Sequence, residues 1–312
     1  IIYFPTCIAF NELDGFKWID EIMTVILMAF TFLNSSVSLN REPRGEYRLF
    51  IGILAFYVVY GLIFGENIEK AVLRDMVQWI RPFSVIYCTW ILNPRFTERQ
   101  KNVMLISMLV TLGAWFLYHP EVNVGADAEF PVLGQLAMCT GMTWYLWKPD
   151  NQKNAYIALA IVLSGMLAPK FKFMGEVVCF VGFVFFLHGK LQFKSPKTIL
   201  ALVVLLAVTL YVTWEKFDIY YVSGLNSNEL ARPMSYRIAF TEIIWDYFPF
   251  GPGMGTWGCA AAADYYSPLL YKYHMSRVWG CDPTNPMFVA DAFYPTLAQL
   301  GVAGIILFCI FW

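Results

Sequence analysis

The chain has 312 residues, of which 58% are hydrophobic and 14% are charged, and its formal net charge is −1. A soluble domain is about 45–50% apolar and about 25% charged, so this composition is typical of a membrane protein. The near-zero net charge, with no basic stripe among the aromatic residues, excludes a nucleic-acid-binding protein.

Both ends of the chain are apolar. It begins with "IIYFPTCIAF", which has neither a starting Met nor the layout of a signal peptide, and it stops at "IILFCIFW" within an apolar run. We therefore expect that both ends interrupt membrane segments and that the complete protein is longer.

Nine apolar runs approach the ~20 residues that a helix needs to cross a bilayer. Several are short and need flanking aromatic residues, such as Trp115 and Trp147, to reach the membrane interface. The predicted spans are 21–39, 49–65, 70–92, 103–118, 132–147, 154–169, 173–187, 198–215 and 287–312. We expect an all-α integral membrane protein with about nine or more transmembrane helices.

The loops between these runs alternate in charge. Those with Arg and Lys are 40–48, 93–102, 148–153 and 188–197. By the positive-inside rule these loops are cytoplasmic, which places the long segment 216–286 outside. The predicted organisation is a transmembrane bundle over 1–215, an extracytoplasmic loop over 216–286 and a C-terminal transmembrane helix over 287–312.

The external loop opens with a helix signal. In "ARPMSYRIAFTEIIWDYFPF" a proline stands in the first turn, where its fixed φ suits a helix. Apolar side chains then recur at helical spacing at Tyr236, Phe240, Ile243, Ile244 and Tyr247. This stripe predicts an amphipathic helix that lies against the membrane surface and ends at Pro249.

A glycine run follows in "PFGPGMGTWG", where Gly253, Gly255 and Gly258 fit the spacing of a dinucleotide-binding turn. That motif requires a preceding strand and a following helix in a βαβ unit. No strand precedes the run, and it lies outside the cytoplasmic nucleotide pool, so this interpretation is excluded. The glycines either cradle an anion with their N–H groups or form a turn that brings two segments close together.

The order of these elements resembles the C-terminal signature of the O-antigen ligase/polymerase superfamily. An Arg-bearing helix, an aromatic-Pro-Phe-Gly-x-Gly-x-Gly run, a loop and "DAFYPTLAQLGVAGIILF" follow one another over 232–308. The resemblance implies a multi-pass glycosyltransferase of the bacterial cytoplasmic membrane, with an outward-facing site. It also implies a substrate carried on undecaprenyl diphosphate, no metal and no cofactor, and a flippase and a chain-length regulator as possible partners.

One position favours the polymerase branch. Ligases of this superfamily commonly have His, often followed by Asn, where this chain has Asp291 and Ala292. We therefore expect polymerisation of oligosaccharide repeat units into O-antigen, capsule or exopolysaccharide. The alternatives are a ligase that delivers the glycan to a lipid or protein acceptor and a transporter of lipid-linked oligosaccharide.

Such a reaction needs a base for the acceptor hydroxyl and cations for the leaving diphosphate. Asp291 is the candidate base, with Tyr294 at i+3 beside it, and Pro295 loosens this turn because it lacks an N–H. Arg237 is the candidate catalytic cation, since its planar fork binds two phosphate oxygens at once. The alternative for Asp291 is an ordinary helix N-terminal acid.

Further candidates for binding the diphosphate are cationic and lie at Arg232, Arg237, Arg81, Arg74, Lys170 and Lys172. Arg74 and Arg81 share one face of a predicted span, where ionisable groups are costly and usually face a cavity or a partner. The alternative for each cation is a simple ion pair. Gly251, Gly253 and Gly255 are predicted to shape the loop.

The remaining reactive side chains indicate no metal site, because the three His residues are scattered and no Cys/His cluster occurs. Cys259 and Cys281 either form a disulfide or stay free. His274 is the only His of the external loop and reads as structural. The aromatic stretch "DYYSPLLYKYHMSRVWG" either stacks on sugar rings or anchors the loop in the membrane interface.

Overall fold

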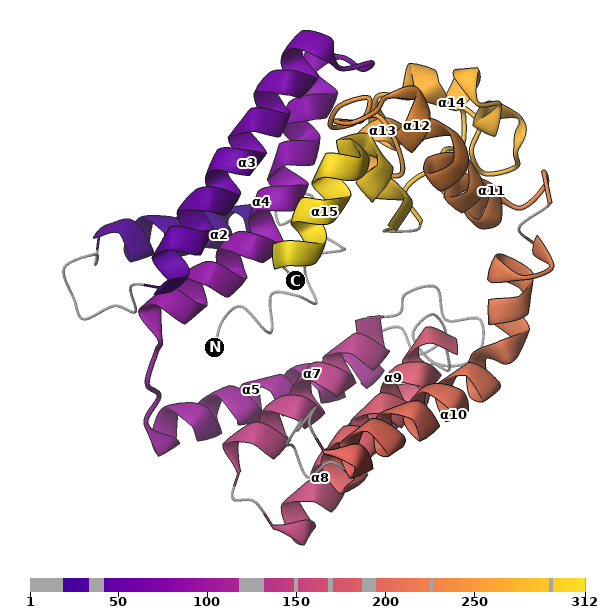
Figure 1. The fold of residues 1–312 in the computed structure, drawn as a ribbon. Helices are drawn as coiled ribbons and strands as arrows, with labels where there is room; N and C mark the ends of the chain where they lie inside the picture. Colours follow the sequence, from indigo (N-terminus) through magenta and orange to yellow (C-terminus); the bar gives the residue numbers. More distant parts are fainter. Residues whose placement is uncertain are drawn as a thin grey trace. The chain divides into compact units, whose positions relative to one another are not determined.

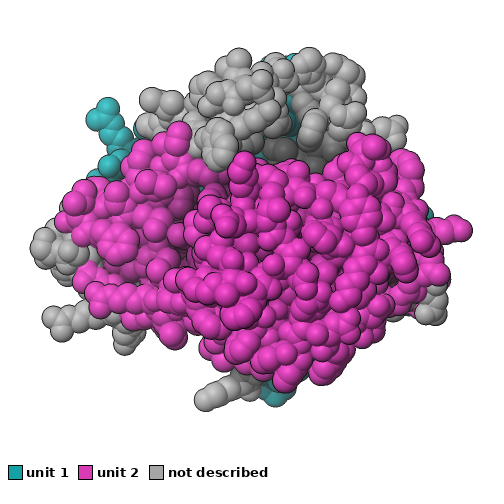
Figure 2. Space-filling model, turned by 90° about the horizontal axis from the view of Figure 1, so that it is seen from above, with its two compact units in different colours: residues 1–18, 95–217 teal, residues 19–94, 218–312 magenta. Residues whose placement is uncertain are grey.

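The computed structural model describes residues 19–33, 42–117, 132–148, 151–167, 171–186, 195–224, 227–291 and 294–311. Within these residues the regular elements are helices, and the only β feature is an isolated bridge between Asp282 and Asn285. The all-α prediction is confirmed. The chain divides into two compact units, residues 1–18 with 95–217 and residues 19–94 with 218–312, which Figure 2 colours separately.

Unit 1 is a set of helices in which α7 packs against both α5 and α8 (Figure 1). Its elements are α5 (Glu98–Leu117), α7 (Val132–Trp147), α8 (Gln152–Ser164), η2 (Gly165–Leu167), α9 (Phe171–Val181), η3 (Gly182–Phe186) and most of α10 (Pro196–Tyr221). The side chain of Asn151 accepts from the N–H of Asn154 and so caps the start of α8.

Unit 2 combines three helices from residues 19–94 with the shorter helices and turns of residues 218–312. Its elements are α2 (Ile19–Leu33), α3 (Glu42–Phe64), α4 (Glu69–Leu92), α11 (Ala231–Ile238), η5 (Ala239–Ile243), α12 (Ile244–Asp246), α13 (Ala260–Asp264), α14 (Pro268–Lys272), η6 (Met275–Arg277), η7 (Tyr294–Leu300) and α15 (Gly301–Phe311). Stacked rings of Tyr47, Phe50, Phe83 and Tyr87 join α3 to α4. The segments α13, η5 and α12 contact α4, η7 and α15 respectively, so the segment 227–291 packs against helices that precede and follow it in the sequence.

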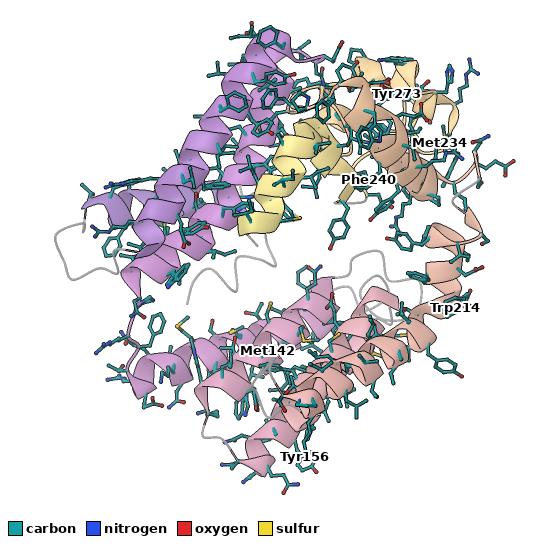
Figure 3. The ribbon with its side chains drawn as sticks, viewed as in Figure 1. Met142, Tyr156, Trp214, Met234, Phe240 and Tyr273 are labelled. Carbon is teal, nitrogen blue, oxygen red and sulfur yellow. The ribbon has the colours of Figure 1, made fainter. Side chains whose placement is uncertain are left out.

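Two described helices are long and apolar enough to cross a membrane, over Arg44–Phe64 and Pro196–Tyr221. The second exposes large apolar side chains along its length, including Leu200, Tyr211 and Trp214, the last of which is labelled in Figure 3. Apolar surface of this extent is compatible with a lipid environment. The structure therefore supports membrane association through two helices, and the count of about nine spans stays a prediction.

The last predicted span, 287–312, does not form one continuous helix. The 3₁₀ segment η7 precedes the α-helix, which begins only at Gly301. Gly301 has φ +61°, and a side chain there would lie 2.3 Å from the backbone N of Gly251. The α-helix starts only at Gly301 for two reasons. Pro295 has no N–H to donate to a helical hydrogen bond, and the close approach to Gly251 requires a glycine at position 301.

The predicted external helix forms over Ala231–Asp246, but its apolar stripe faces the protein. Ile243 and Ile244 are buried in a core cluster with Trp257 and Leu270, and Phe240 packs against that cluster. Met234, Phe240 and Tyr273 of this region are labelled in Figure 3. The expectation that this face lies on the membrane surface was therefore wrong. A helical period predicts an apolar face, and here residues that follow the helix in the sequence, such as Trp257 and Leu270, cover that face.

Candidate functional site

The glycine run adopts a backbone that only glycine tolerates. Gly251, Gly253 and Gly255 have φ values of +78°, +96° and +77°. A side chain at Gly251 would lie 2.4 Å from the carbonyl oxygen of Gln299, and one at Gly255 would lie 2.7 Å from the backbone of Ala71. The run thus brings the start of α4 and the segment η7 into backbone contact, which is the second of the two roles expected for it.

The N–H groups of this run point into the protein. Gly253 donates to the carbonyl oxygen of Gln299 at 3.1 Å. Gly255 donates to Gln299 Oε1 at 2.9 Å and to Asp75 Oδ2 at 3.2 Å, and the N–H of Thr256 reaches Gln299 Oε1 at 3.3 Å. These amides hold the fold together and do not form an anion cradle.

Asp75 and Gln299 form the buried polar centre beneath the glycine run. Both side chains are fully buried, and Gln299 Nε2 donates to Asp75 Oδ2 at 2.6 Å. The Trp79 indole N–H donates to the same oxygen at 3.2 Å, whereas Asp75 Oδ1 has no hydrogen-bond partner among the described residues. Sequence reasoning placed neither Asp75 nor Gln299 among the candidate site residues, although a polar side chain within an apolar run was the available signal.

Arg232 and Asp291 come together from positions 59 residues apart to form an ion pair, in which Arg232 Nε donates to Asp291 Oδ2. The two side chains are 39% and 25% exposed, so the pair is partly open to its surroundings. The hydrogen bond from Arg232 to Asp291 raises the pKa of the guanidinium, which stays protonated. The sequence named both residues but gave no sign that they meet.

Tyrosines surround this pair. The guanidinium of Arg232 lies 5.0 Å from the ring centroid of Tyr220, within the range of a cation–π contact. Tyr236, one helical turn after Arg232, accepts a hydrogen bond at 3.3 Å from the hydroxyl of Tyr221, and its burial raises its pKa. We call Tyr220, Tyr221, Arg232, Tyr236 and Asp291 the Arg232 site. Predicted Tyr294 is 57% exposed and lies near enough to Tyr236 to raise that pKa further.

The other predicted arginines have partners of their own. Arg237 Nη2 donates to Asn228 Oδ1 at 2.6 Å. Arg74 pairs with Asp264 at 3.5 Å, not with the adjacent Asp75. Arg81 pairs with Glu21 of α2 at 3.1 Å. These contacts match the ion-pair alternative for Arg74 and Arg81, so Arg232 is the arginine that the structure joins to a predicted catalytic residue.

Lys170 lies outside the described residues, and the structure gives only the backbone of Lys172, in α9 of unit 1. Their predicted roles in binding the diphosphate therefore stay predictions.

The two loop cysteines are not joined. Cys259 and Cys281 are both buried free thiols, and burial raises the pKa of each. The N–H of Ala262 donates to the Cys259 sulfur, which caps α13. The disulfide alternative is therefore wrong for this structure. His274 takes a left-handed backbone conformation with φ +61° ahead of η6, as a residue of a turn.

Comparison of the chain with protein-family profiles, with curated proteins and with solved structures found no match in any of the three.

Proposed function

We propose that this protein is an integral membrane glycosyltransferase that polymerises oligosaccharide repeat units carried on undecaprenyl diphosphate, on the outer side of the bacterial cytoplasmic membrane. The observation that carries the proposal is the ion pair between Arg232 and Asp291, because it places a phosphate-binding cation beside a carboxylate in one partly open site. The sequence resemblance over 232–308 supplies the reaction class. The proposed fold has about nine or more transmembrane helices, among them the two apolar helices already noted.

The residues of the Arg232 site suit this chemistry. The acceptor hydroxyl oxygen forms a bond to the anomeric carbon of the donor sugar, and the bond from that carbon to the diphosphate oxygen breaks. The Asp291 carboxylate takes the hydroxyl proton, and the lipid diphosphate leaves with the bonding electron pair. Arg232 balances the charge that develops on the diphosphate. A direct displacement of this kind inverts the anomeric centre.

The size of each contribution follows from these roles. A positioned base contributes about 10²–10⁴-fold to the rate. A charged donor aimed at the developing negative charge contributes about 10²–10³-fold. We therefore expect Asp291→Ala and Arg232→Ala each to lower the rate of chain extension by at least about 100-fold.

The test uses the full chain in liposomes with undecaprenyl-diphosphate-linked repeat units, and product length is read on a gel. The wild type gives a ladder of multiples, and Asp291→Ala and Arg232→Ala lose it. Arg277→Ala and Glu98→Gln, which remove a charge elsewhere, keep it. A ladder that survives Asp291→Ala overturns the assignment of the base.

Two other results overturn the polymerase proposal itself. A single transfer that requires an added lipid or protein acceptor identifies a ligase. Movement of the lipid-linked oligosaccharide across the bilayer with no transfer identifies a transporter.

A further inference from the structure

Asp291 occupies the position that an anionic ligand of Arg232 needs. Arg232 Nε donates to Asp291 Oδ2, and the Tyr220 ring lies beside the same guanidinium. A carboxylate and a phosphate oxygen bind guanidinium through the same charge-assisted hydrogen bonds. A diphosphate that binds Arg232 must therefore compete with Asp291.

The amides of Gly253 and Gly255 offer this anion no second position. The N–H groups of Gly253 and Gly255 are bonded to Gln299 and Asp75, at distances between 2.9 and 3.2 Å. An anion that used those amides would first have to break the buried polar centre. The exposed part of the Arg232 side chain is open to a ligand at a lower cost, because only one carboxylate has to move.

We infer that Asp291 is an internal competitor that holds Arg232 until a diphosphate displaces it, so that donor binding and release of the base are one event. The inference rests on the proposed function and adds its order of events. In the ion pair, a lone pair of Asp291 is engaged by Arg232 and is not available to a sugar hydroxyl. When the diphosphate takes the guanidinium, the carboxylate is released beside the donor and accepts the proton of the acceptor.

The contacts around Arg232 are suited to this exchange. The cation–π contact places the guanidinium over the ring of Tyr220 and does not involve Asp291. Arg232 therefore keeps one partner when Asp291 leaves. Without a donor, Asp291 stays paired with Arg232, so the site does not activate hydroxyl groups until a diphosphate binds.

The inference is tested by binding alone. The full chain, in nanodiscs, is titrated with radiolabelled inorganic pyrophosphate and with farnesyl diphosphate. If the ion pair leaves Arg232 open for roughly a tenth of the time, removing the competing charge raises the apparent affinity about tenfold. We expect this gain in Asp291→Asn, and we expect the added change Arg232→Gln to abolish it. Glu98→Gln removes one negative charge from an exposed pair with Lys101 and serves as the matched control, with unchanged binding.

Several results overturn the inference. Equal affinity of the wild type and Asp291→Asn means that Asp291 does not compete. An equal gain in Glu98→Gln means that net charge alone is responsible, and no binding of either probe by either protein means that Arg232 holds no diphosphate. A gain in affinity for pyrophosphate indicates that the diphosphate group suffices. A gain for farnesyl diphosphate alone assigns the anion to a lipid headgroup. Both results support the competition.

The two proposals fail in different ways. An affinity gain in a protein that never extends a glycan leaves the competition intact and removes the proposed function. A product ladder without the gain leaves the function intact and removes the competition.

Discussion

Replacing Gln299 with leucine tests whether the buried polar centre holds unit 2 together. The amide donates to Asp75 Oδ2 at 2.6 Å and accepts from the N–H groups of Gly255 and Thr256. Leucine removes these three bonds and the longer hydrogen bond from the Cys259 thiol at 3.7 Å, but keeps a similar volume. The Thr256 N–H then lacks a partner, which costs about 1–3 kcal/mol. The Asp75 carboxylate keeps Gly255 and Trp79 as donors but loses one hydrogen bond to a charged group, worth about 1.5–3 kcal/mol. Gly255 keeps its bond to Asp75, so we expect a net loss of about 2–4 kcal/mol in the free energy of unfolding after the apolar gain of leucine.

That loss is a large part of the roughly 5–15 kcal/mol by which a domain is stable. It is measured by denaturant unfolding in mixed micelles, followed by tryptophan fluorescence, to which the buried Trp79 and Trp257 contribute. The matched control is Gln152→Leu, because Gln152 is exposed and donates to the Tyr156 hydroxyl at 3.3 Å. A change below about 0.5 kcal/mol, the usual range for surface substitutions, in both variants would refute the reasoning.

Two further predictions concern Gly255 and Cys281. Gly255→Ala puts a methyl group 2.7 Å from the Ala71 backbone at φ +77°, so we expect it to lower the free energy of unfolding by at least about 1–3 kcal/mol. The control is Gly113→Ala, at a position in α5 where a methyl group meets open space, and we expect it to raise the free energy of unfolding by about 0.5–1 kcal/mol. Equal effects of Gly255→Ala and Gly113→Ala would contradict the steric account. Burial raises the pKa of the Cys281 thiol from 9.0 to about 12, so its contribution to stability is complete below pH 9 and declines as the pH rises toward 12. Unfolding curves between pH 8 and 11 measure this decline, and a slope that Cys281→Ala leaves unchanged would assign it to other groups.

Local patterns predicted local structure well. The proline and the apolar repeat between Ala231 and Asp246 predicted a helix, and the glycine spacing predicted a tight turn, since both depend on residues a few positions apart. The surface against which that helix packs was not predictable, because Trp257 lies in the irregular turn after the helix and Leu270 lies in the later short helix α14. A helical period identifies an apolar face but not its partner.

Contacts between residues far apart in the sequence could not be predicted from it. Arg232 and Asp291 were both candidate site residues. Their ion pair joins positions 59 residues apart, and no periodic pattern in the sequence indicates such a contact. Gln299 lies 224 residues from Asp75 in an otherwise apolar run, so neither residue identified the other. Ion pairing at Arg74 and Arg81 was considered in advance, but the partners, Asp264 and Glu21, come from other helices.

The glycine run and Gln299 are joined by hydrogen bonds and close backbone contacts, and this affects how mutational scans of this protein are interpreted. Substitutions at Gly251, Gly255, Asp75 or Gln299 all disturb one buried centre, so they share a phenotype although none of them has to touch a ligand. Under the proposed function, loss of activity there will resemble loss at Asp291 in a growth screen. Protein abundance separates the two groups, because the first lowers the amount of folded protein and the second leaves it unchanged.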